Sequence, residues 1–465
     1  MSTASRTVSA RLPDIVGAPH VFTDPTELNS FAVDGIVPAA AVRPGSSDEV
    51  VEIVKYAASE KLALIPCGAR TKLGIGSPPL RYDLALDMTR LERIISYDPG
   101  DLTLSVEPGV PLRKLAATLA EHRQFLPLSV PYFNQATVGG TIASGVDNPL
   151  RQFYGTSRDY ILGMEFAIGE GVRSKSGGCV VKNVTGYDLH KLMIGSLGTL
   201  GVITRINFKT FPMLVGSRGF VAAFESLDRA IEMRHRVAQS ALTPVTIELL
   251  SPSVAELFEQ PAAEKITGTV MPPNLISRKH WALTIGFAGN ENVLARYETD
   301  LRRIAAESAA AGITVISDKV RSAAFAHKRE FVPIALAASR AATIVKLGVL
   351  PMRMKEALDA GAKAADANEL PWAAMARGLG VIYFVLLPTE RNDAAHRKVT
   401  AATNQILAAA SALDANATIP WCPAEWKSTL KIWGPERSDI AQMQKVKKIF
   451  DPIGIFSPGR FVGGF

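Results

Sequence analysis

The sequence predicts an α+β protein with two principal domains, the second built on an antiparallel sheet. At 465 residues the chain is longer than one ordinary domain. Between Pro131 and Pro212, glycines separate short strand-like runs. After Pro212 glycine becomes less frequent and alanine more so, and strand-like runs alternate with amphipathic helices to about Thr418. This pattern is typical of helices packed on an antiparallel sheet.

Composition excludes several classes of protein. Hydrophobic residues make up 47% and charged residues 20%, as in a globular protein with an ample core. The net charge of +7 comes without a dense Lys/Arg cluster, which argues against nucleic acid as a partner. An anionic cofactor or substrate, an acidic partner subunit, or a basic surface without a specific target all fit this charge.

The apolar runs, the N-terminal residues and the cysteines bear on the location of the protein and on the metal centres that it could hold. No run approaches the roughly 18 apolar residues of a membrane span, and the N-terminus lacks the apolar core of a secretory signal. We therefore expect a cytoplasmic protein without a transmembrane segment. Cys67, Cys179 and Cys422 are isolated and too few for a four-cysteine iron–sulfur cluster. An iron–sulfur relay would have to lie on another chain, and no metal site is expected.

The first elements alternate strand and helix. Ala39–Arg43 is predicted to be a strand, and Ser46 with Glu49 forms a capping box for a helix to about Lys61. A short buried strand, Leu62–Pro66, leads into the loop CGARTKLGIG. Asp83–Asp87 and Leu102–Val106 follow as strands, and a helix begins near Pro111.

The glycine-dense stretch indicates a backbone that approaches a ligand closely. Glycine adopts positive φ without strain, and consecutive amides in such turns form concave anion sites. The strand-like runs of the stretch are Ile161–Ile168, Cys179–Val181 and Leu200–Phe208, with a helix-like run at Tyr187–Ile194. A backbone of this kind suits a long diphosphate cofactor.

Three segments carry a resemblance to a known family: PYFNQATVGGTIASG, KNVTGYDLHKLMIGSLGTLGVIT and the terminal FDPIGIFSPGRFVGG. They resemble the FAD-binding domain of the vanillyl-alcohol-oxidase/PCMH family, most of all the FAD-binding accessory subunits of bacterial glycolate oxidases. The similarity runs from about Val42 to Pro212 and from Phe450 to Gly464. It implies a two-part PCMH-type FAD-binding domain at 39–213 after a lead-in at 1–38. A cap domain at 214–437 and a C-terminal segment at 438–465, which folds back on the FAD domain, complete the expected arrangement.

The resemblance also implies the residues that hold FAD. In the family, the loop after the second strand wraps the pyrophosphate, the glycine-rich segment holds the diphosphate, and a later strand faces the adenine. The corresponding positions are Gly68, Ala69, Arg70, Thr71, Lys72, Leu73, Pro131, Thr137, Val138, Gly139, Gly140, Thr141, Ala143, Ser144, Gly145, Gly155, Asp159, Val202 and Ile203. Taken without the resemblance, the first loop fits an ordinary glycine-containing surface turn better than a cofactor loop. Thr71 and Lys72 stand where relatives with covalent FAD often have histidine, so we expect non-covalent FAD.

Four polar residues fall where the family places the flavin ring: Lys182, Asn183, Tyr187 and Asp188. Lys182 either places positive charge near the flavin or lies on the solvated surface. Asp188 is expected to cap a helix and Tyr187 to be half-buried. Arg460 either faces an anionic ligand or forms a structural salt bridge. The tryptophans Trp421, Trp426 and Trp433 fit a core, a lid over the flavin, or a subunit contact.

The second domain is predicted as two rounds of strands and helices on one antiparallel sheet. The predicted strands are Gly219–Phe224, Trp281–Phe287, Thr314–Ile316, Thr343–Leu350 and Gly380–Leu387. The predicted helices are Ser226–Ser240, Val293–Ala311, Met354–Ala365 and Ala394–Ala412. Family members that oxidise 2-hydroxy acids usually carry a histidine pair or cluster in this region. Here His235, His280, His327 and His396 stand singly, so we expect the chain not to oxidise such an acid alone.

Three hypotheses about function follow. The first is an FAD-binding oxidoreductase subunit of a glycolate-oxidase-like complex, which takes electrons from a small 2-hydroxy acid or a partner flavoprotein. Such a complex implies an iron–sulfur subunit and a second FAD subunit as partners. The second is a self-sufficient FAD-linked oxidase or dehydrogenase of a small hydroxy acid or alcohol. The third is a scaffold subunit that binds FAD without turnover.

Overall fold

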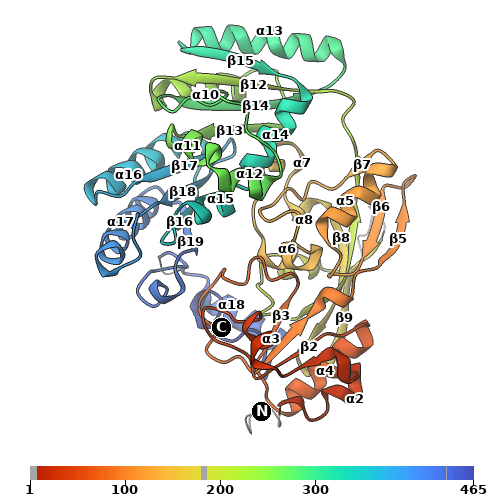
Figure 1. Cartoon of the computed structure of the whole chain (residues 1–465). Coiled ribbons are helices and arrows are strands. Elements are labelled where there is room, and N and C mark those ends of the chain that lie inside the picture. The colour runs from red at the N-terminus through yellow and green to blue at the C-terminus, as the bar shows by residue number, and fades with distance from the viewer. Residues whose placement is uncertain (1–7, 180–185, 436) are drawn as a thin grey trace.

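The computed structural model describes residues 8–179, 186–435 and 437–465. Figure 1 shows the N-terminal half of the chain forming one body and the residues after Pro212 forming a second body above and beside it. The C-terminal helix α18 (Ile440–Phe450) returns to the first body. The second body is called the cap domain below.

The N-terminal domain begins with a small sheet of order β1-β2-β4-β3, in which β2, β4 and β3 run parallel. Its strands are β1 (Val21–Phe22), β2 (Ala40–Val42), β3 (Leu64–Cys67) and β4 (Leu84–Asp87). Its helices are α2 (Leu12–Val16), η1 (Ala18–His20), α3 (Pro25–Asn29), α4 (Ser47–Ser59) and η2 (Met88–Arg90). The Ser46 hydroxyl accepts from the Glu49 amide as predicted, while the Glu49 carboxylate accepts from the Gly45 amide.

A five-stranded antiparallel sheet of order β5-β6-β10-β8-β9 forms the other part of this domain. Its strands are β5 (Ile94–Asp98), β6 (Thr103–Val106), β8 (Ile161–Ile168), β9 (Val172–Gly177) and β10 (Val202–Lys209). β7 (Gln124–Phe125) pairs with β11 (Phe211–Pro212). The helical segments are α5 (Leu112–Glu121), α6 (Val138–Ser144), α7 (Arg151–Tyr154), α8 (Ser157–Tyr160), η3 (Gly169–Gly171) and α9 (His190–Met193). The prediction of a two-part domain is thus confirmed.

The cap domain is one antiparallel sheet of order β15-β12-β14-β13-β17-β18-β16-β19. Its strands are β12 (Ser217–Phe224), β13 (Thr246–Leu250), β14 (Trp281–Ala288), β15 (Gly312–Ile316), β16 (Thr343–Gly348), β17 (Trp372–Arg377), β18 (Val381–Leu386) and β19 (Asn416–Trp421). The predicted α+β class and antiparallel sheet are confirmed. β13, β17 and β19 were not predicted.

Helices cover both faces of the cap sheet. One face packs against α10 (Leu227–Gln239), α13 (Glu291–Glu307), α16 (Met354–Ala367) and α17 (Asp393–Ala412), together with η4 (Pro351–Arg353). The other packs against α11 (Ser253–Glu259), α12 (Pro261–Thr267), α14 (Asp318–Arg329) and α15 (Phe331–Ala338). Along β12, Phe220 joins the first core and Val221 the second, as the alternation of a strand requires. The four long helices match their predicted positions to within a few residues, whereas the short ones were missed.

The C-terminal segment lies along β3. The Leu64 amide donates to the Ile455 carbonyl at 2.8 Å, and the Ser457 amide donates to the Leu64 carbonyl at 2.9 Å. η5 (Ala424–Trp426) precedes α18, and η6 (Val462–Gly464) follows it. The return of the tail therefore rests on main-chain hydrogen bonds, while the exact domain limits stay predictions. In the part of the chain that the structure describes, no helix is long and apolar enough to cross a membrane.

Two side-chain predictions near α9 are wrong. Tyr187 is not half-buried, because 89% of it is exposed. Asp188 does not cap α9, since the residue before the helix is Leu189 and the Asp188 carboxylate pairs with Lys191 at 2.6 Å. His190 in α9 is buried, and its Nδ1 lies 3.0 Å from the Ser176 hydroxyl, which is a structural role. Lys182 and Asn183 lie outside the described residues.

Candidate flavin site

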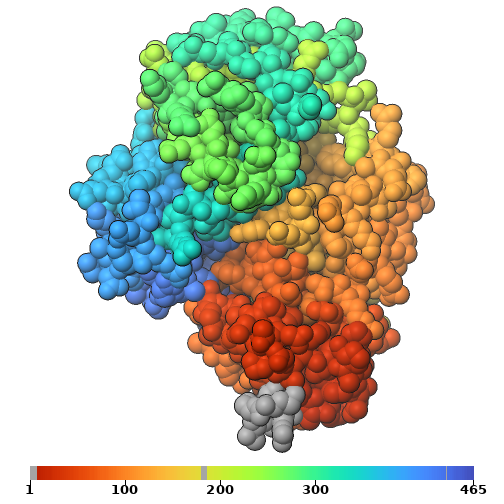
Figure 2. All heavy atoms as spheres, in the orientation of Figure 1, coloured from red at the N-terminus to blue at the C-terminus, as the bar shows by residue number. Residues whose placement is uncertain are grey.

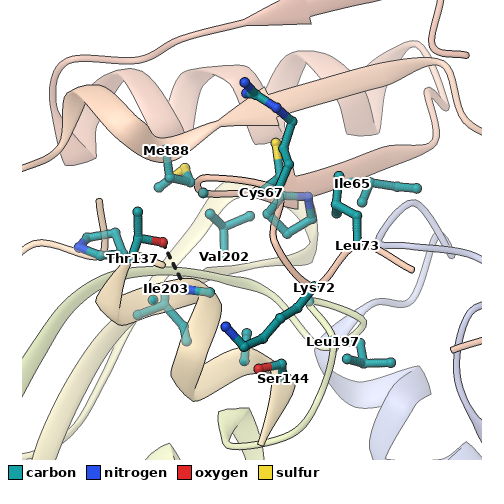
Figure 3. Close-up of a pocket in the computed structure, with 18 of the residues that line it drawn as sticks. Ile65, Cys67, Lys72, Leu73, Met88, Thr137, Ser144, Leu197, Val202 and Ile203 are labelled. Carbon is teal, nitrogen blue, oxygen red and sulfur yellow. Dashed lines mark hydrogen bonds between the residues drawn. The ribbon is translucent and has the colours of Figure 1, made fainter. Parts of the chain in front are cut away.

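A cavity opens between the two parts of the N-terminal domain (Figure 3). Its walls come from the end of β3 and the loop that follows, from α6, from the segment before β10, and from the C-terminal tail. The lining residues are Ile65–Leu73, Met88, Pro108, Thr137, Gly139, Gly140, Ala143, Ser144, Ser196, Leu197, Gly198, Gly201, Val202, Ile203 and Arg460. Segments more than 380 residues apart in sequence thus share one wall.

The loop after β3 supplies free main-chain donors. The amides of Ala69, Arg70, Thr71 and Lys72 donate to no acceptor in the described residues, and all four residues line the cavity. Arg70 has a φ of +60°, which turns the chain tightly at this point. Buried amides without partners are costly, and consecutive ones form an anion-binding concavity. This loop therefore has the form of an anion cradle, and its role in holding the diphosphate of a cofactor stays a prediction.

Arg460 of the C-terminal tail hydrogen-bonds to the loop that follows β3. Its Nη2 donates to the carbonyls of Leu73 and Ile75, at 2.6 and 2.5 Å. Its Nη1 is buried without a hydrogen-bond partner, although the residue is only 2% exposed and lines the cavity. Arg460 forms no ion pair with any described residue, so of the two predicted alternatives the geometry favours the one that faces an anionic ligand.

The glycines of α6 act differently from the prediction. The Gly139 amide donates to the Pro108 carbonyl at 2.7 Å and the Val138 amide to the Val110 carbonyl at 2.9 Å, so neither is free for a phosphate. A Cβ at Gly139 would lie 2.5 Å from the Pro108 side chain. Gly139 is therefore needed for close packing, and Val138 is a core residue. The Gly140 amide makes only a long contact, 3.4 Å, with the Thr137 hydroxyl, and both residues line the cavity.

The start of β10 leaves an open backbone edge at the cavity. Val202 and Ile203 pair with β8 on one side, but β6 pairs with β10 only from Ile206 onward. Their other edge is free of a strand partner where they line the cavity. This edge fits the predicted main-chain contact to adenine, which stays a prediction.

Several predicted positions do not line this cavity: Pro131, Val138, Thr141, Gly145, Gly155 and Asp159. The Asp159 carboxylate accepts from the amide and hydroxyl of Thr156, so it caps α8 instead. Gly155 ends α7 with a φ of +77°. Thr141 and Gly145 border a neighbouring pocket on the far side of α6. Gly145, Gly155 and Asp159 follow α6 and lie away from the cavity, whereas Val138 and Thr141 are buried positions of α6 that do not line it.

Two titratable side chains face the cavity from the loop. Burial lowers the pKa of Lys72 to about 8, with the Glu330 carboxylate acting in the opposite direction. Burial raises the pKa of the Cys67 thiol, so this thiol stays protonated at neutral pH. Cys67 is thus a buried and unreactive residue of the cavity wall.

A second chamber adjoins the cavity beneath the cap. It shares Ser144 and Leu197 with the cavity and has a volume of about 240 Å³. Its walls are mostly apolar: Ile75, Ile419, Pro420, Trp421, Ile432, Trp433 and Phe461. Three polar side chains line it from the cap: Lys346 on β16, Tyr383 on β18 and Thr418 on β19. Trp421 and Trp433 therefore line a chamber next to the cavity, whereas Trp426 lies in the cap core.

In the described part of the chain, Lys346 has no ion-pair partner and the Tyr383 hydroxyl has no hydrogen-bond partner. The Lys346 ammonium forms no ion pair there, and burial lowers its pKa. The Tyr383 hydroxyl is buried without a hydrogen-bond partner, and the residue is 1% exposed. Unpaired buried groups of this kind are expected where a polar ligand binds. Sequence reasoning found neither residue, because nothing in the strands that carry them differs from ordinary core.

A buried chain of ion pairs links the two domains beside the chamber. Arg377 at the end of β17 pairs with Asp147 of the N-terminal domain at 2.9 Å and with Glu248 of β13 at 3.1 Å. Lys328 pairs with Glu248 at 2.5 Å, and Arg151 with Asp147 at 3.2 Å. The chain joins three cations to two carboxylates, and Lys346, whose charged form Asp147 favours, forms no ion pair with a described residue.

The cradle of free amides, the orphan guanidinium nitrogen and the unpaired strand edge define a site for a long diphosphate-containing cofactor. Beside it lies a separate chamber of the size of a small substrate. This combination is that of an FAD-dependent oxidoreductase, and FAD is its cofactor.

The family follows from comparison with known proteins. Residues 38–175 match the FAD binding domain model, and residues 217–418 match the model of the C-terminal domain of FAD linked oxidases. The chain belongs to this family of FAD-linked oxidases, as the resemblance predicted.

Relatives of known name agree with this family. The chain is 24% identical to glycolate oxidase subunit GlcD of Bacillus subtilis over 91% of its own length and 89% of the relative's. It is 38% identical to glycolate oxidase subunit GlcE of Escherichia coli, over 36% of its own length and 47% of the relative's. A D-lactate dehydrogenase of Anaerostipes hadrus is 30% identical over 52% of this chain and 51% of that protein.

Solved structures share the fold across nearly the whole chain. Substrate-bound p-cresol methylhydroxylase has a TM-score of 0.79 at 16% identity, and the match covers 99% of this chain and 97% of the other. Alkyldihydroxyacetonephosphate synthase has a TM-score of 0.74 at 17% identity, over 98% of this chain and 86% of the other. At these identities the likeness establishes the fold alone.

Proposed function

We propose that this protein is the FAD-binding subunit of a glycolate-oxidase-like complex and that it oxidises a small 2-hydroxy acid. The observation that carries the proposal is the unpaired Lys346 ammonium in the chamber that adjoins the flavin cavity. Lys346 is half-buried and forms no ion pair with a described residue, so an anion that enters the chamber would stabilise its charged form. The carboxylate of a 2-hydroxy acid is such an anion.

The chamber offers a division of roles among its side chains. Lys346 binds the substrate carboxylate, and the Tyr383 hydroxyl, which has no other partner, hydrogen-bonds to an oxygen of the substrate. The apolar walls formed by Trp421, Trp433 and Phe461 exclude water and strengthen both interactions. FAD, when bound, accepts the two electrons that leave the substrate carbon.

The names of the relatives support this substrate class. The glycolate oxidase subunits and the D-lactate dehydrogenase carry names of 2-hydroxy-acid enzymes. A further relative is the D-2-hydroxyglutarate dehydrogenase of Xanthomonas citri, 29% identical over 47% of this chain. Its substrate also combines a carboxylate with a neighbouring hydroxyl.

The route by which electrons leave the flavin supports a complex with other chains. Among the described residues no cluster of three or more His, Cys, Asp or Glu could hold a metal ion, and the chain has three cysteines. Electrons that leave the flavin toward iron–sulfur centres therefore need another chain. We propose an iron–sulfur subunit and a second FAD subunit as partners.

We also propose that FAD is held non-covalently in a cytoplasmic enzyme. No histidine lines the cavity, and its one thiol, Cys67, is buried and protonated. Precipitation with acid should release all of the flavin to the supernatant. Flavin retained on the precipitated chain would contradict this part of the proposal.

Anaerobic mixing of the FAD-loaded chain with glycolate, D-lactate and L-lactate tests the function. We expect slow loss of the flavin absorbance with one of these acids when the chain is alone, and faster loss with an electron acceptor when the partner chains are present. Full turnover by the chain alone would favour the self-sufficient enzyme. Flavin that stays oxidised with every acid, even in the complex, would favour the scaffold and overturn the proposal.

A further inference from the structure

Lys72 is a buried cation at the cap side of the flavin cavity. It extends from the loop after β3 into the cavity, toward Ser144, the residue that the cavity shares with the cap chamber (Figure 3). The residue is 8% exposed. Its Nζ forms no ion pair with a described residue, and its hydrogen-bond partner is the Thr71 hydroxyl at 3.3 Å. The ring of Tyr132 lies 5.8 Å from the ammonium.

The carboxylate whose charge acts on Lys72 is that of Glu330, which belongs to the cap. Glu330, between α14 and α15, accepts hydrogen bonds from the amides of Tyr132 and Phe133 at 2.6 and 3.2 Å. Its neighbour Arg329 donates to the same carboxylate at 2.9 Å and stacks over the ring of Phe133. These contacts seat the cap on the N-terminal domain directly beside Lys72. Burial disfavours the charged form of Lys72, and Glu330 opposes this effect.

We propose that the side chain of Lys72 sets the reduction potential of the bound FAD and that Glu330 of the cap keeps it charged. Two-electron reduction of FAD with uptake of one proton leaves one additional negative charge on the flavin. The electrons come from the substrate of the enzyme, or from dithionite in the test below. A cation held in the same water-poor cavity stabilises that charge more than it stabilises the oxidised cofactor. The inference rests on FAD binding and not on the identity of the substrate.

The arrangement makes the cap part of the redox site. If the Glu330 carboxylate moved away with the cap, burial alone would act on Lys72 and its proton would be lost more easily. The position of the cap over the substrate chamber is therefore coupled to the charge of Lys72 through the Glu330 carboxylate. The other charged and titratable groups at this place are Arg329 and Tyr132, and the pKa of Tyr132 is raised to about 12 by burial and by Glu330. Tyr132 thus stays neutral in the working range of pH.

The test is the midpoint potential of FAD in Lys72→Met, measured by dithionite titration against a reference dye. We expect the equilibrium to shift at least about tenfold toward oxidised FAD, because a nearby opposite charge commonly shifts an ionisation by one to three pKa units. A tenfold shift corresponds to about 30 mV for a two-electron couple. Lys72→Arg keeps the charge and should keep most of the potential. Lys175→Met removes an exposed lysine and should leave the potential unchanged.

A double-mutant cycle of Lys72 and Glu330 measures how much the cap contributes to the FAD potential through Lys72. It does not depend on the behaviour of any single variant. Glu330→Gln should lower the potential in the parent protein but have little effect in the Lys72→Met background. In the parent protein the potential should fall more steeply with pH above about 8, where Lys72 loses its proton in the oxidised state. Weaker FAD binding with an unchanged potential would mean that Lys72 serves the diphosphate, and would overturn the proposal. So would equal potentials for Lys72→Met and Lys72→Arg that both differ from the parent.

Discussion

Arg377 of the cap and Asp147 of the N-terminal domain form an ion pair of 2.9 Å in which both side chains are buried. Arg377 also pairs with Glu248, so one guanidinium balances two buried carboxylates from different domains. Because Asp147 follows α6 and Arg377 ends β17, the pair fixes the cap against the wall of the flavin cavity. The pair is therefore a structural link between the site and the cap.

Loss of this link should be costly. Arg377→Met removes one cation from two buried carboxylates. Asp147 then keeps only Arg151 as an ion-pair partner, and Glu248 keeps only Lys328. Because buried negative charge is left poorly compensated, we expect the free energy of unfolding to fall by about 3–5 kcal/mol. Urea denaturation measures it. Lys398→Met, which breaks the exposed pair with Glu369, should cost less than about 1 kcal/mol. Equal costs for the two variants would show that the buried pair carries no special weight.

Removal of the Lys346 charge should weaken binding of an anionic substrate. We expect Lys346→Met to raise KM for the acid about tenfold or more with an intact flavin spectrum, because a charged hydrogen bond contributes about 1.5–3 kcal/mol. Lys346→Arg keeps the charge and should be affected less.

The pH dependence follows from the direction of the pKa shift. Burial lowers the pKa of Lys346 from 10.5, so its positive charge is present at low pH and is lost earlier than usual as the pH rises. KM for the acid should therefore rise toward alkaline pH in the parent protein and be flatter in Lys346→Met. A KM that is unchanged by the substitution at every pH would remove Lys346 from the substrate site.

A large side chain at Gly140 should displace the cofactor without unfolding the protein. A Cβ there meets only the Thr137 hydroxyl, at 3.2 Å, so the backbone tolerates it, while a longer side chain enters the space that Gly140 lines. We expect Gly140→Leu to purify folded and colourless, as judged by circular dichroism and the 450 nm absorbance. Gly312→Leu, on the exposed edge strand β15 with no atom near its Cβ position, is the matched control. Stoichiometric FAD in Gly140→Leu would place the cofactor elsewhere.

Arg460 should matter for FAD affinity because it holds the loop that carries the free amides. Arg460→Met removes two hydrogen bonds to loop carbonyls and the unpartnered Nη1. Each charged hydrogen bond contributes about 1.5–3 kcal/mol, so we expect the Kd for FAD to rise by at least about tenfold. Fluorescence titration of the flavin-free protein measures it. A Kd equal to that of the parent would mean that the loop keeps its shape without Arg460.

Local sequence signals predicted the parts of the fold that short-range physics decides. The Ser46 cap, the long amphipathic helices and the runs that became β8 and β10 follow from spacing of a few residues. The short helices α11, α12, α14 and α15 were missed, since they span at most 12 residues and depend on packing against the cap sheet. β13 and β17 were missed because every residue of β13 and every residue of β17 after Trp372 is buried, which removes the alternation that marks a strand.

The sequence by itself determined the cofactor and indicated the loop after β3, because its motifs resemble those of a known family of flavoproteins. Only the tertiary structure decided which donors are free. It showed that the Gly139 amide is bound to Pro108 while the amides of Ala69–Lys72 are not. It also brought Lys346 and Tyr383 from the cap to the chamber beside the flavin cavity, Glu330 of the cap to the amide of Tyr132, and Arg460 from the C-terminus to the cavity wall. Contacts between residues hundreds of positions apart depend on how the domains pack, and no local pattern in one sequence records that packing.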